Sequence, residues 1–459
     1  MKIKVDSKIT IQDINKEVLE YCNKQLFLPN PDVQKKKAMG FWTGNLQKNI
    51  KLFTKKGNDY ILPIGCIKDV WNLHPYKEDY IVNFGQHNKI EYPKLKFELF
   101  PYQKAAVDRM VMVRRGILQA PCGSGKSICA VEIVRRIGYK AIVIVQTMEI
   151  LNQFKNYFLN VMGLDKTDIG IIAAGKVEIG NKVTLALRQT LCNVDLLQYK
   201  NEWGCIIIDE CQNISSNPAK ITQYEKILNN LCAEYRISLS ATPKRMDGMT
   251  KAMLALCGKV EHIISQDDVK DKTIKADIQP IYTKYEIPIC CQKFDGTILY
   301  TQLSSNMAIN EERNKLIIDL LQKEKNNYCL ILSDRLEGLE ILHKKIGGLF
   351  VNGKMTSKKA KQEREEAIEK MREKKEHYLF ATYSLAKEGL DIKSLNRLFL
   401  IAPTKNSNVL VQSIGRIERK DEGKQTPICY DIIDDDIYFE KAWKTRKGIY
   451  KKNNNKILD

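Results

Sequence analysis

The chain has 459 residues, 44% of them hydrophobic, and its 74 Lys and Arg residues outnumber its 55 Asp and Glu residues to give a net charge of +19. It is too long for one ordinary hydrophobic core, so we expect two or three domains. No apolar run approaches the roughly 20 residues of a membrane span. The excess positive charge favours a polyanionic partner, with nucleic acid first and an acidic membrane surface second, although a lysine-rich proteome would produce the same bias.

The cysteines and the N-terminus bear on the cellular compartment. The 13 cysteines include no Cys-x-x-Cys pair, and several lie inside apolar runs, such as Cys205 and Cys329. A thiol in such a run behaves as a small hydrophobic side chain. Residues 1–6 lack the apolar block of a signal peptide. We therefore expect reduced structural cysteines and an intracellular protein, either cytoplasmic or nucleoid-associated.

Residues 1–94 lack the regular alternation of the rest of the chain, and they predict a small N-terminal accessory domain of α+β type. They contain a run of three lysines at 35–37 and the aromatic pair Phe41-Trp42. Bases can stack on aromatic rings beside lysines that hold phosphates, so this segment is a candidate nucleic-acid-binding element. The alternative interpretation is a small hydrophobic core with a charged edge.

Between residues 95 and 268, apolar β-branched runs alternate with helical stretches, which predicts a parallel sheet covered by helices. The runs are apolar on both faces, as expected for central strands. We expect one α/β domain here. Its predicted strands are 116–119, 141–146, 183–187, 205–208 and 237–239.

The most informative motif follows the first of these strands, where residues 120–127 read Ala-Pro-Cys-Gly-Ser-Gly-Lys-Ser. Gly123 and Gly125 let successive backbone N–H groups face inward without a Cβ in the way. The helix that follows adds unpaired donors and a partial positive charge at its N-terminus. Lys126 can then reach the β- and γ-phosphates, and the Ser127 hydroxyl suits Mg²⁺. The loop predicts a nucleoside triphosphate site, although its first residue is Ala where the general pattern has Gly.

Two further strand ends carry polar residues that suit the same chemistry. Asp209 at the end of 205–208 can hold the metal through its water shell, and Glu210 can orient and deprotonate the attacking water. Ser240 and Thr242 follow the next strand, and their hydroxyl groups could cap the next helix. Two acidic residues at a strand end are common, but in this order after the phosphate loop they indicate ATP hydrolysis.

The second half of the chain repeats the alternation, so a second α/β domain is expected over 306–437. A linker at 269–305, richer in Lys, Asp, Pro and Thr, would precede it. A tail at 438–459, with an asparagine run that frays, would follow it. The predicted strands are 329–333, 349–352, 378–382, 398–402 and 428–433.

Two arginines of this second half suit the neutralisation of charge on a transferring phosphate. Arg416 and Arg419 are three residues apart, so on a helix they would project from one face. Guanidinium groups supplied from a second domain would act as arginine fingers.

Taken in order, these motifs resemble those of superfamily 2 helicases, over roughly residues 99–436. Ala is an accepted first residue of the loop in this superfamily. The matching segments are Tyr102-Gln103, residues 120–127, Asp209-Glu210-Cys211-Gln212, Ser240-Ala241-Thr242, Glu388-Gly389-Leu390-Asp391 and the Gln-x-x-Gly-Arg-x-x-Arg run at 412–419. The segments at 100–103 and 240–245 look most like the DEAH-like branch, which contains XPB, phage recombination helicases of the UvsW type and poxvirus transcript-release helicases. The implied fold is α/β, with two tandem RecA-like P-loop domains that have parallel sheets.

The resemblance also implies a role for each matching residue. ATP would be held by Gln103 at the adenine, by Gly123, Ser124, Gly125, Lys126 and Ser127 at the phosphates, and by Gly389 and Asp391 at the ribose. Ser127 and Asp209 would hold Mg²⁺, and the catalytic residues would be Lys126, Glu210, Gln412, Arg416 and Arg419. Ser240 and Thr242 would couple the ATP state to the interdomain cleft, and nucleic acid would be contacted near Gln146, Thr147 and Thr382. Gln212 departs from the DEAH pattern, which has His, but its amide could still bridge the two domains.

These observations predict an ATP-dependent helicase or translocase with ATP and Mg²⁺ as cofactors, nucleic acid as partner and no membrane association. DNA is favoured because the most similar branch consists largely of DNA translocases and branch-remodelling enzymes, some of them encoded by phages and viruses that act inside a host cell. One alternative is an RNA or transcript-release helicase. The others are a nucleic-acid-binding ATP switch without processive unwinding, and a defence-complex subunit that would need a nuclease partner.

Overall fold

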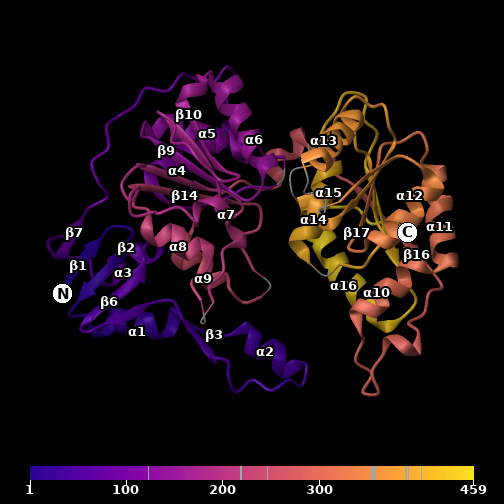
Figure 1. The fold of residues 1–459 in the computed structure, drawn as a ribbon, viewed down its shortest axis with the longest axis horizontal. Helices are drawn as coiled ribbons and strands as arrows, with labels where there is room; N and C mark the ends of the chain where they lie inside the picture. Colours follow the sequence, from indigo (N-terminus) through magenta and orange to yellow (C-terminus); the bar gives the residue numbers. More distant parts are fainter. Residues whose placement is uncertain are drawn as a thin grey trace. The chain divides into compact units, whose positions relative to one another are not determined.

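The computed structural model describes residues 1–121, 123–217, 220–245, 247–352, 358–387, 390, 392–404 and 406–458. The chain divides into two compact units, Met1–Ser265 and Gln266–Asp459 (Figure 1). Within the described ranges, no helix is long and apolar enough to cross a membrane.

The N-terminal part of the first unit is a small α+β assembly. Its five-stranded sheet has the order β5-β6-β2-β1-β7 and is antiparallel except for the β1–β7 pair. Side chains of β1 alternate between exposed and buried, so Ile3 and Val5 face a core that Val18 and Val70 share. The elements are β1 (Lys2–Val5), β2 (Lys8–Gln12), α1 (Lys16–Gln25), β3 (Phe27–Pro29), α2 (Pro31–Ala38), β4 (Asn49–Lys51), β5 (Thr54–Lys56), β6 (Asp59–Pro63), α3 (Ile67–Leu73) and β7 (Tyr80–Val82).

The rest of the first unit is built on an eight-stranded sheet with the order β11-β10-β12-β9-β13-β14-β8-β15. Its strands run parallel except for β11. Strands β9 and β13 are buried at every residue, as required when both faces of a sheet are covered. The elements are α4 (Pro101–Val113), β8 (Arg115–Gln119), α5 (Lys126–Ile137), β9 (Ala141–Val145), α6 (Met148–Asn156), β10 (Ile169–Ala173), β11 (Lys176–Val177), β12 (Val183–Leu187), α7 (Arg188–Leu191), β13 (Cys205–Ile208), α8 (Gln223–Asn230), β14 (Tyr235–Ser240), α9 (Thr250–Cys257) and β15 (Val260–Ile263).

All five strands predicted for this region are present, with ends shifted by at most two residues. Strands β10, β11 and β15 were not predicted from the sequence. Gly170 interrupts the apolar run of β10, and its closely packed backbone leaves no room for a Cβ. The Val-Glu-His-Ile sequence of β15 lies at the edge of the sheet, where one side is free of a neighbouring strand and polar residues are tolerated.

The second unit contains a six-stranded parallel sheet with the order β16-β21-β20-β17-β19-β18. Its core joins the inner face of the sheet to helices that include α13, where Met371 is fully buried. The elements are β16 (Asp277–Tyr282), α10 (Tyr300–Ile309), α11 (Glu311–Lys323), β17 (Cys329–Ser333), α12 (Leu336–Ile346), β18 (Leu349–Val351), α13 (Lys358–Arg372), β19 (Tyr378–Thr382), α14 (Tyr383–Lys387), β20 (Arg397–Leu400), α15 (Ser407–Ile417), β21 (Ile428–Ile433) and α16 (Ile437–Lys452).

Two expectations for this half of the chain are wrong. The segment expected to be a linker contains β16, which pairs with β21 along its whole length and so belongs to the sheet. The C-terminal segment is not a frayed tail, because α16 buries Trp443 and Tyr450 against the sheet. Asn455 is also buried, and its amide donates to the Ala276 carbonyl at 3.0 Å. Both segments are polar enough to suggest solvent exposure, and only their packing reveals their place in the fold.

Candidate active site

The predicted motifs of the first unit meet at one edge of the eight-stranded sheet. Strands β13, β14 and β8 are neighbours and run parallel, so their carboxyl ends point to the same side. The loop before Lys126 follows β8, Asp209 follows β13, and Ser240 ends β14. In an open parallel sheet, this edge is where ligands bind. The Ala120 amide donates to the Ser240 carbonyl at 2.9 Å, which ties the phosphate loop to the end of β14.

The loop has the backbone geometry that its sequence predicts. Gly123 and Gly125 have φ angles of +82° and +78°, a region that favours glycine. The Ser124 side chain is buried, and its hydroxyl donates to the Pro121 carbonyl at 2.7 Å. Helix α5 begins at Lys126, so its first backbone N–H groups face the loop. These features suit the loop to bind the phosphates of a nucleotide.

Gln103 holds this loop from the side. Its Nε2 donates to the Ser124 carbonyl at 2.9 Å, and its Oε1 accepts from the Phe100 amide at 3.1 Å. A Cβ on Gly125 would lie 2.4 Å from the same Nε2, so the contact requires glycine there. The first turn of α4 is therefore fastened to the phosphate loop, a link that the sequence did not reveal.

Lys126 and Glu210 form an ion pair with 2.6 Å between Nζ and Oε1. Glu210 has a φ of +50°, a left-handed conformation that is uncommon for a residue other than glycine. This backbone turn at the end of β13 presents the carboxylate to the loop. The lysine and the glutamate neutralise each other.

Asp209 is the buried carboxyl group of the site, with 4% of its surface exposed. Burial raises its pKa to about 7, the charge of Glu210 adds to the rise, and Lys126 opposes it. Among the described residues, its Oδ1 has no hydrogen-bond partner. A buried carboxylate oxygen without a protein partner fits a site for a divalent cation, which would favour the ionised form.

Gln212 connects the acidic motif to the end of β14. Its Nε2 donates to Glu210 Oε2, and its Oε1 accepts from the Ser240 hydroxyl at 2.6 Å. The Ser240 oxygen in turn accepts from the Thr242 amide at 3.0 Å. The Gln212 side chain thus links Glu210 to Ser240. Both of these described contacts lie inside the first unit. The helix-cap interpretation of Ser240 and Thr242 is wrong, because the next helix begins at Thr250.

The structure adds Arg245 to the residues of the site. One of its guanidinium nitrogens donates to the Gln212 carbonyl, and its Nε donates to Asp247 at 3.0 Å. It lies five residues beyond Ser240, in a run of basic residues that looks like a surface loop. Its contact fixes the backbone of the linking glutamine.

The two predicted nucleic-acid contacts of this unit lie beside the acidic motif, at the end of β9. Gln146 Nε2 is 3.5 Å from the Glu210 carbonyl. The Thr147 hydroxyl is the N-cap of α6 and accepts from the Ile150 amide at 3.5 Å. A direct contact of either residue with nucleic acid stays a prediction.

The site residues predicted for the second unit lie on and after α15. Gln412 is largely buried in the helix, and Arg416 donates to the Leu390 carbonyl at 3.1 Å. The expectation that Arg416 and Arg419 share a helix face is wrong, because α15 ends at Ile417 and Arg419 forms an isolated β-bridge with Thr273. The two side chains are therefore positioned by different backbone geometries.

Three other predicted positions belong to the same unit. Thr382 ends β19, and its hydroxyl lies 2.9 Å from that of Ser384. Gly389 and Asp391, predicted to approach the ribose, lie outside the described residues.

Comparison with known proteins agrees with this geometry. Residues 96–245 match the family model described as "Type III restriction enzyme, res subunit", and residues 312–421 match "Helicase conserved C-terminal domain". A putative ATP-dependent RNA helicase of Acanthamoeba polyphaga mimivirus is 26% identical over 77% of this chain and 68% of its own length. A DNA 3'-5' translocase, XPB2 of Sulfurisphaera tokodaii, is 23% identical over 71% of this chain and 80% of its own length. Among solved structures, S. cerevisiae Dbp5 bound to RNA and ADP BeF3 shares the fold with a TM-score of 0.54 at 15% identity, over 78% of this chain and 94% of that one.

The parallel sheets, the phosphate loop and the two matched domains define an ATP-dependent enzyme of the helicase class. The chain belongs to the superfamily 2 helicases. The predicted family and the predicted pair of RecA-like domains are confirmed.

Proposed function

We propose that this helicase translocates along DNA and uses ATP hydrolysis at the carboxyl edge of the eight-stranded sheet to do so. The observation that carries the proposal is the chain of contacts from Lys126 through Glu210 and Gln212 to Ser240. These contacts join the phosphate loop to the end of a neighbouring strand. A change at the γ-phosphate would therefore alter the hydrogen bonds at the end of β14. The net charge of +19 and the relative named as a DNA translocase support DNA as the track.

The nucleotide site would work through residues of both units. Lys126 would bind the phosphates, and Ser127 and Asp209 fit a Mg²⁺ ion, because Asp209 has a buried oxygen without a described protein partner. When bound, the ion would neutralise phosphate charge during transfer. Gln103, Gly123, Ser124 and Gly125 would complete the cradle on the first unit. The second unit would contribute Gln412, Arg416 and Arg419 to the phosphates and Gly389 and Asp391 to the ribose.

The ion pair in the structure suggests how hydrolysis is controlled. Phosphate oxygens would compete with Glu210 for the Lys126 ammonium. Once released, Glu210 would orient a water molecule and accept its proton, the role of a general base. Because Gln212 contacts both side chains, a movement of the Glu210 carboxylate would shift Ser240, and Thr242 would move with Ser240. Gln146, Thr147 and Thr382 would contact the nucleic-acid backbone.

The described cysteines support the intracellular compartment in which such an enzyme would act. They are free thiols, and all but Cys290 are buried. Unpaired thiols are typical of reducing compartments. The viral relatives support an origin in a virus or phage that acts inside its host.

The test is the ATPase rate of the protein alone and with single-stranded DNA, RNA and branched DNA. We expect the largest stimulation with DNA. If RNA stimulates most, the protein is an RNA helicase, an alternative that the mimivirus relative favours. If no nucleic acid stimulates hydrolysis, the motor function is wrong.

Two substitutions test the assigned roles. Lys126→Ala should abolish ATP binding and hydrolysis together, whereas Glu210→Gln should retain ATP binding and lower kcat by roughly 10²- to 10⁴-fold. Glu202→Gln is the matched control, because Glu202 pairs with Lys140 at the surface of the same unit, and its ATPase rate should not change. A Glu210→Gln protein with normal turnover would disprove the assignment of the base.

A further inference from the structure

A basic groove lies in the first unit, between the N-terminal assembly and the helices that follow the ATP motifs. Its volume is about 990 Å³, and it is bordered by β2, β4, β5 and β6 on one side and by α8 and α9 on the other. The described residues that line it include a single carboxylate, Glu225, which is engaged by the Thr222 amide at 2.8 Å. They also include five lysines, namely Lys8, Lys48, Lys51, Lys56 and Lys220.

The five groove lysines differ in their charge pairing from other lysines at the junction between the N-terminal assembly and the rest of the first unit. Away from the groove, lysines are matched with carboxylates across the junction: Lys68 with Glu261 at 2.5 Å and Lys200 with Asp6 at 3.0 Å. In the described part of the chain, none of the five groove lysines forms an ion pair. Gathering like charges in one concave surface is unfavourable unless an external anion neutralises them. The groove therefore has the charge of a binding site for a polyanion.

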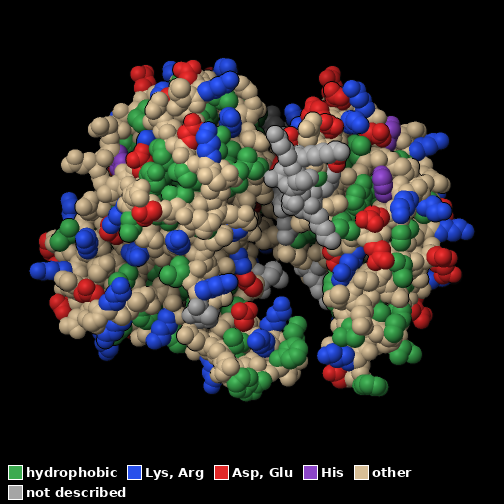
Figure 2. All heavy atoms as spheres, in the orientation of Figure 1, with side chains coloured by type: hydrophobic (Ala, Val, Ile, Leu, Met, Phe, Trp, Pro, Cys, Tyr) green, Lys and Arg blue, Asp and Glu red, His purple; other side chains and the backbone are tan. Residues whose placement is uncertain are grey.

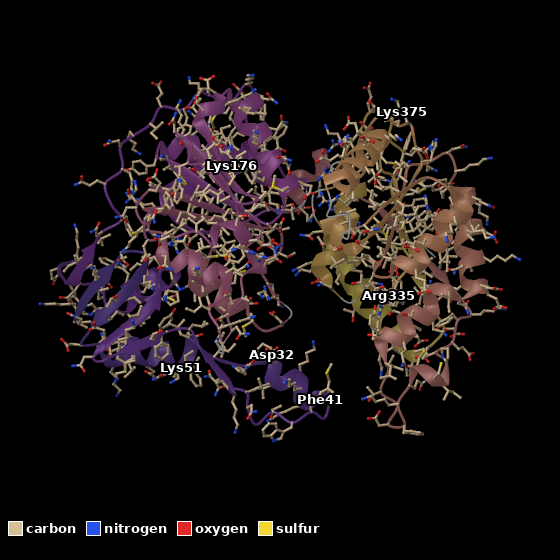
Figure 3. All side chains as sticks on the ribbon, viewed as in Figure 1. Asp32, Phe41, Lys51, Lys176, Arg335 and Lys375 are labelled. Atoms are coloured by element: carbon tan, nitrogen blue, oxygen red, sulfur yellow. The ribbon has the colours of Figure 1, made fainter. Side chains whose placement is uncertain are left out.

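An arm continues from the edge of this groove, and it consists of β3, α2, β4 and the loop before β4. Strands β3 and β4 pair with each other, and Leu28 and Ile50 anchor them against Met249 and Ala252 at α9. Helix α2 carries exposed lysines at 35–37, and the loop after it exposes Phe41 by 60% and Trp42 by 75%. Figure 3 places Lys51 and Phe41 at opposite ends of the arm, and Figure 2 shows hydrophobic side chains beside lysines at its far end.

Large exposed aromatic rings next to lysines are costly for a surface that meets only water. Bases stack on such rings, while the lysines hold the phosphates that connect the bases. A base in a duplex already stacks on its neighbours, so the rings favour unpaired bases. The arm therefore adds a preference for single strands to the charge of the groove.

The groove also touches the segments that follow two ATP motifs. Residues Ser216, Asn217 and Lys220 come soon after Gln212 in the chain, and Ala252 and Ala255 lie on the helix that follows Ser240 and Thr242. A ligand in the groove would thus contact both segments. One segment begins after Gln212 and the other after Ser240, and these two residues take part in the hydrogen bonds that start at Glu210. Binding there can bias the ATP site by shifting these segments.

We propose that the groove and the arm form an accessory site for single-stranded nucleic acid, separate from the predicted contacts at Gln146, Thr147 and Thr382. The lysines of the groove hold the phosphate backbone, and Phe41 and Trp42 stack on unpaired bases. This inference rests on the proposed function, because it assumes a nucleic-acid substrate. The site keeps one strand attached to the first unit.

The test compares two sets of variants in the full chain, with a fluorescent 30-nucleotide single strand as the probe and no ATP. The groove variant is Lys48→Ala, Lys51→Ala and Lys56→Ala together. The matched control removes three exposed lysines of the same N-terminal assembly, Lys2→Ala, Lys16→Ala and Lys77→Ala. The groove variant should bind roughly 100-fold more weakly at 0.1 M salt, and the slope of log K against log salt should fall by about 2. The control variant should keep the wild-type slope and the wild-type basal ATPase rate.

The arm is tested by Phe41→Ala and Trp42→Ala, which should weaken single-strand binding about tenfold and leave duplex binding unchanged. An equal loss for the duplex would overturn the assignment to single strands. If nucleic acid stimulates the ATPase of the wild type but the groove variant keeps its affinity and salt slope, the groove assignment is wrong while the motor function stands. If no nucleic acid stimulates the wild type, the motor function itself has failed.

Discussion

In the second unit, two buried carboxylates of the sheet edge, Asp431 and Asp434, are matched by arginines. Asp431 accepts from Arg446 at 2.8 and 2.9 Å and from the Tyr450 hydroxyl at 2.6 Å, and Arg313 donates to Asp434 at 2.7 Å. In the sheet of the first unit, Asp209 is buried to a similar degree, but its Oδ1 has no described partner. A buried carboxylate that loses its partner is costly, and a buried carboxylate oxygen without a protein partner fits a cation site. The difference distinguishes the carboxylates that are satisfied within the fold from the one that is suited to a ligand.

The largest effect on ATP hydrolysis is expected from the loss of Arg416, which the second unit would supply to the phosphates. Arg416→Ala should lower the nucleic-acid-stimulated kcat by about 10³-fold or more and leave the ATP affinity nearly unchanged, because an arginine finger acts mainly on the transition state. Stopped-flow measurement of phosphate release, with ATP binding measured separately, checks this. Arg372→Ala, on the exposed face of α13, is the control. A normal rate for Arg416→Ala would mean that Arg416 does not act as an arginine finger.

Breaking a matched pair should damage stability instead of catalysis. Asp431→Asn leaves the Arg446 guanidinium buried without its counter-charge, which should cost about 3–5 kcal/mol in the free energy of unfolding of the second unit. Hydrogen exchange over β21 and α16, together with urea unfolding, measures this loss. Glu369→Gln removes an exposed ion pair on α13 and should cost about 0–1 kcal/mol. Equal losses in the two variants would contradict the distinction between buried and exposed pairs.

The linking amide of the first unit should have an intermediate effect. Gln212→Ala removes the contacts to Glu210 and Ser240, so stimulation of ATP hydrolysis by nucleic acid should fall about tenfold, as expected for the loss of one or two hydrogen bonds. The basal rate should change less. Gln212→His should retain most of the stimulation, because an imidazole can also link an acceptor to a hydroxyl. Titration of the ATPase rate with single-stranded DNA distinguishes these outcomes.

The smallest effect concerns Lys424, whose Nζ donates to the Arg419 carbonyl at 2.6 Å. Burial lowers its pKa to about 8, although Asp421 opposes the shift. Lysine in an unfolded chain titrates near 10.4, so between pH 8 and 10 the unfolded state binds more protons, and the stability of the folded state rises with pH. The wild type should therefore gain about 2 °C in Tm relative to Lys424→Met between pH 7 and pH 9.5. Lys420→Met, at an exposed position, should show no such trend.

Much of the motor could be predicted from the sequence, for a physical reason. Central strands of a parallel sheet are buried on both faces, so they must be continuous apolar runs, and 205–208, 329–333 and 378–382 were predicted with the bounds that the structure shows. The phosphate loop is similarly local, because two glycines and the following helix create its geometry within a few residues. Family resemblance then supplied the order of the remaining motifs.

Features that depend on contacts between distant segments could not be found in this way. Edge strand β16 is polar enough to resemble a linker, and its place in the sheet depends on β21, about 150 residues later. The contact between Gln212 and Ser240 joins two strand ends that only the strand order brings together.

By itself, therefore, the sequence determined the central strands of the two sheets and the residues of the phosphate loop, because each follows from local polarity and backbone geometry. It determined the class of the protein through the resemblance of its motifs to those of a known family. Only the tertiary structure decided which charges are matched. It leaves Asp209 Oδ1 without a described partner, and it gathers Lys8, Lys51 and Lys220 in one groove from positions up to 212 residues apart. Charge pairing depends on distance in space, and that distance is set by packing.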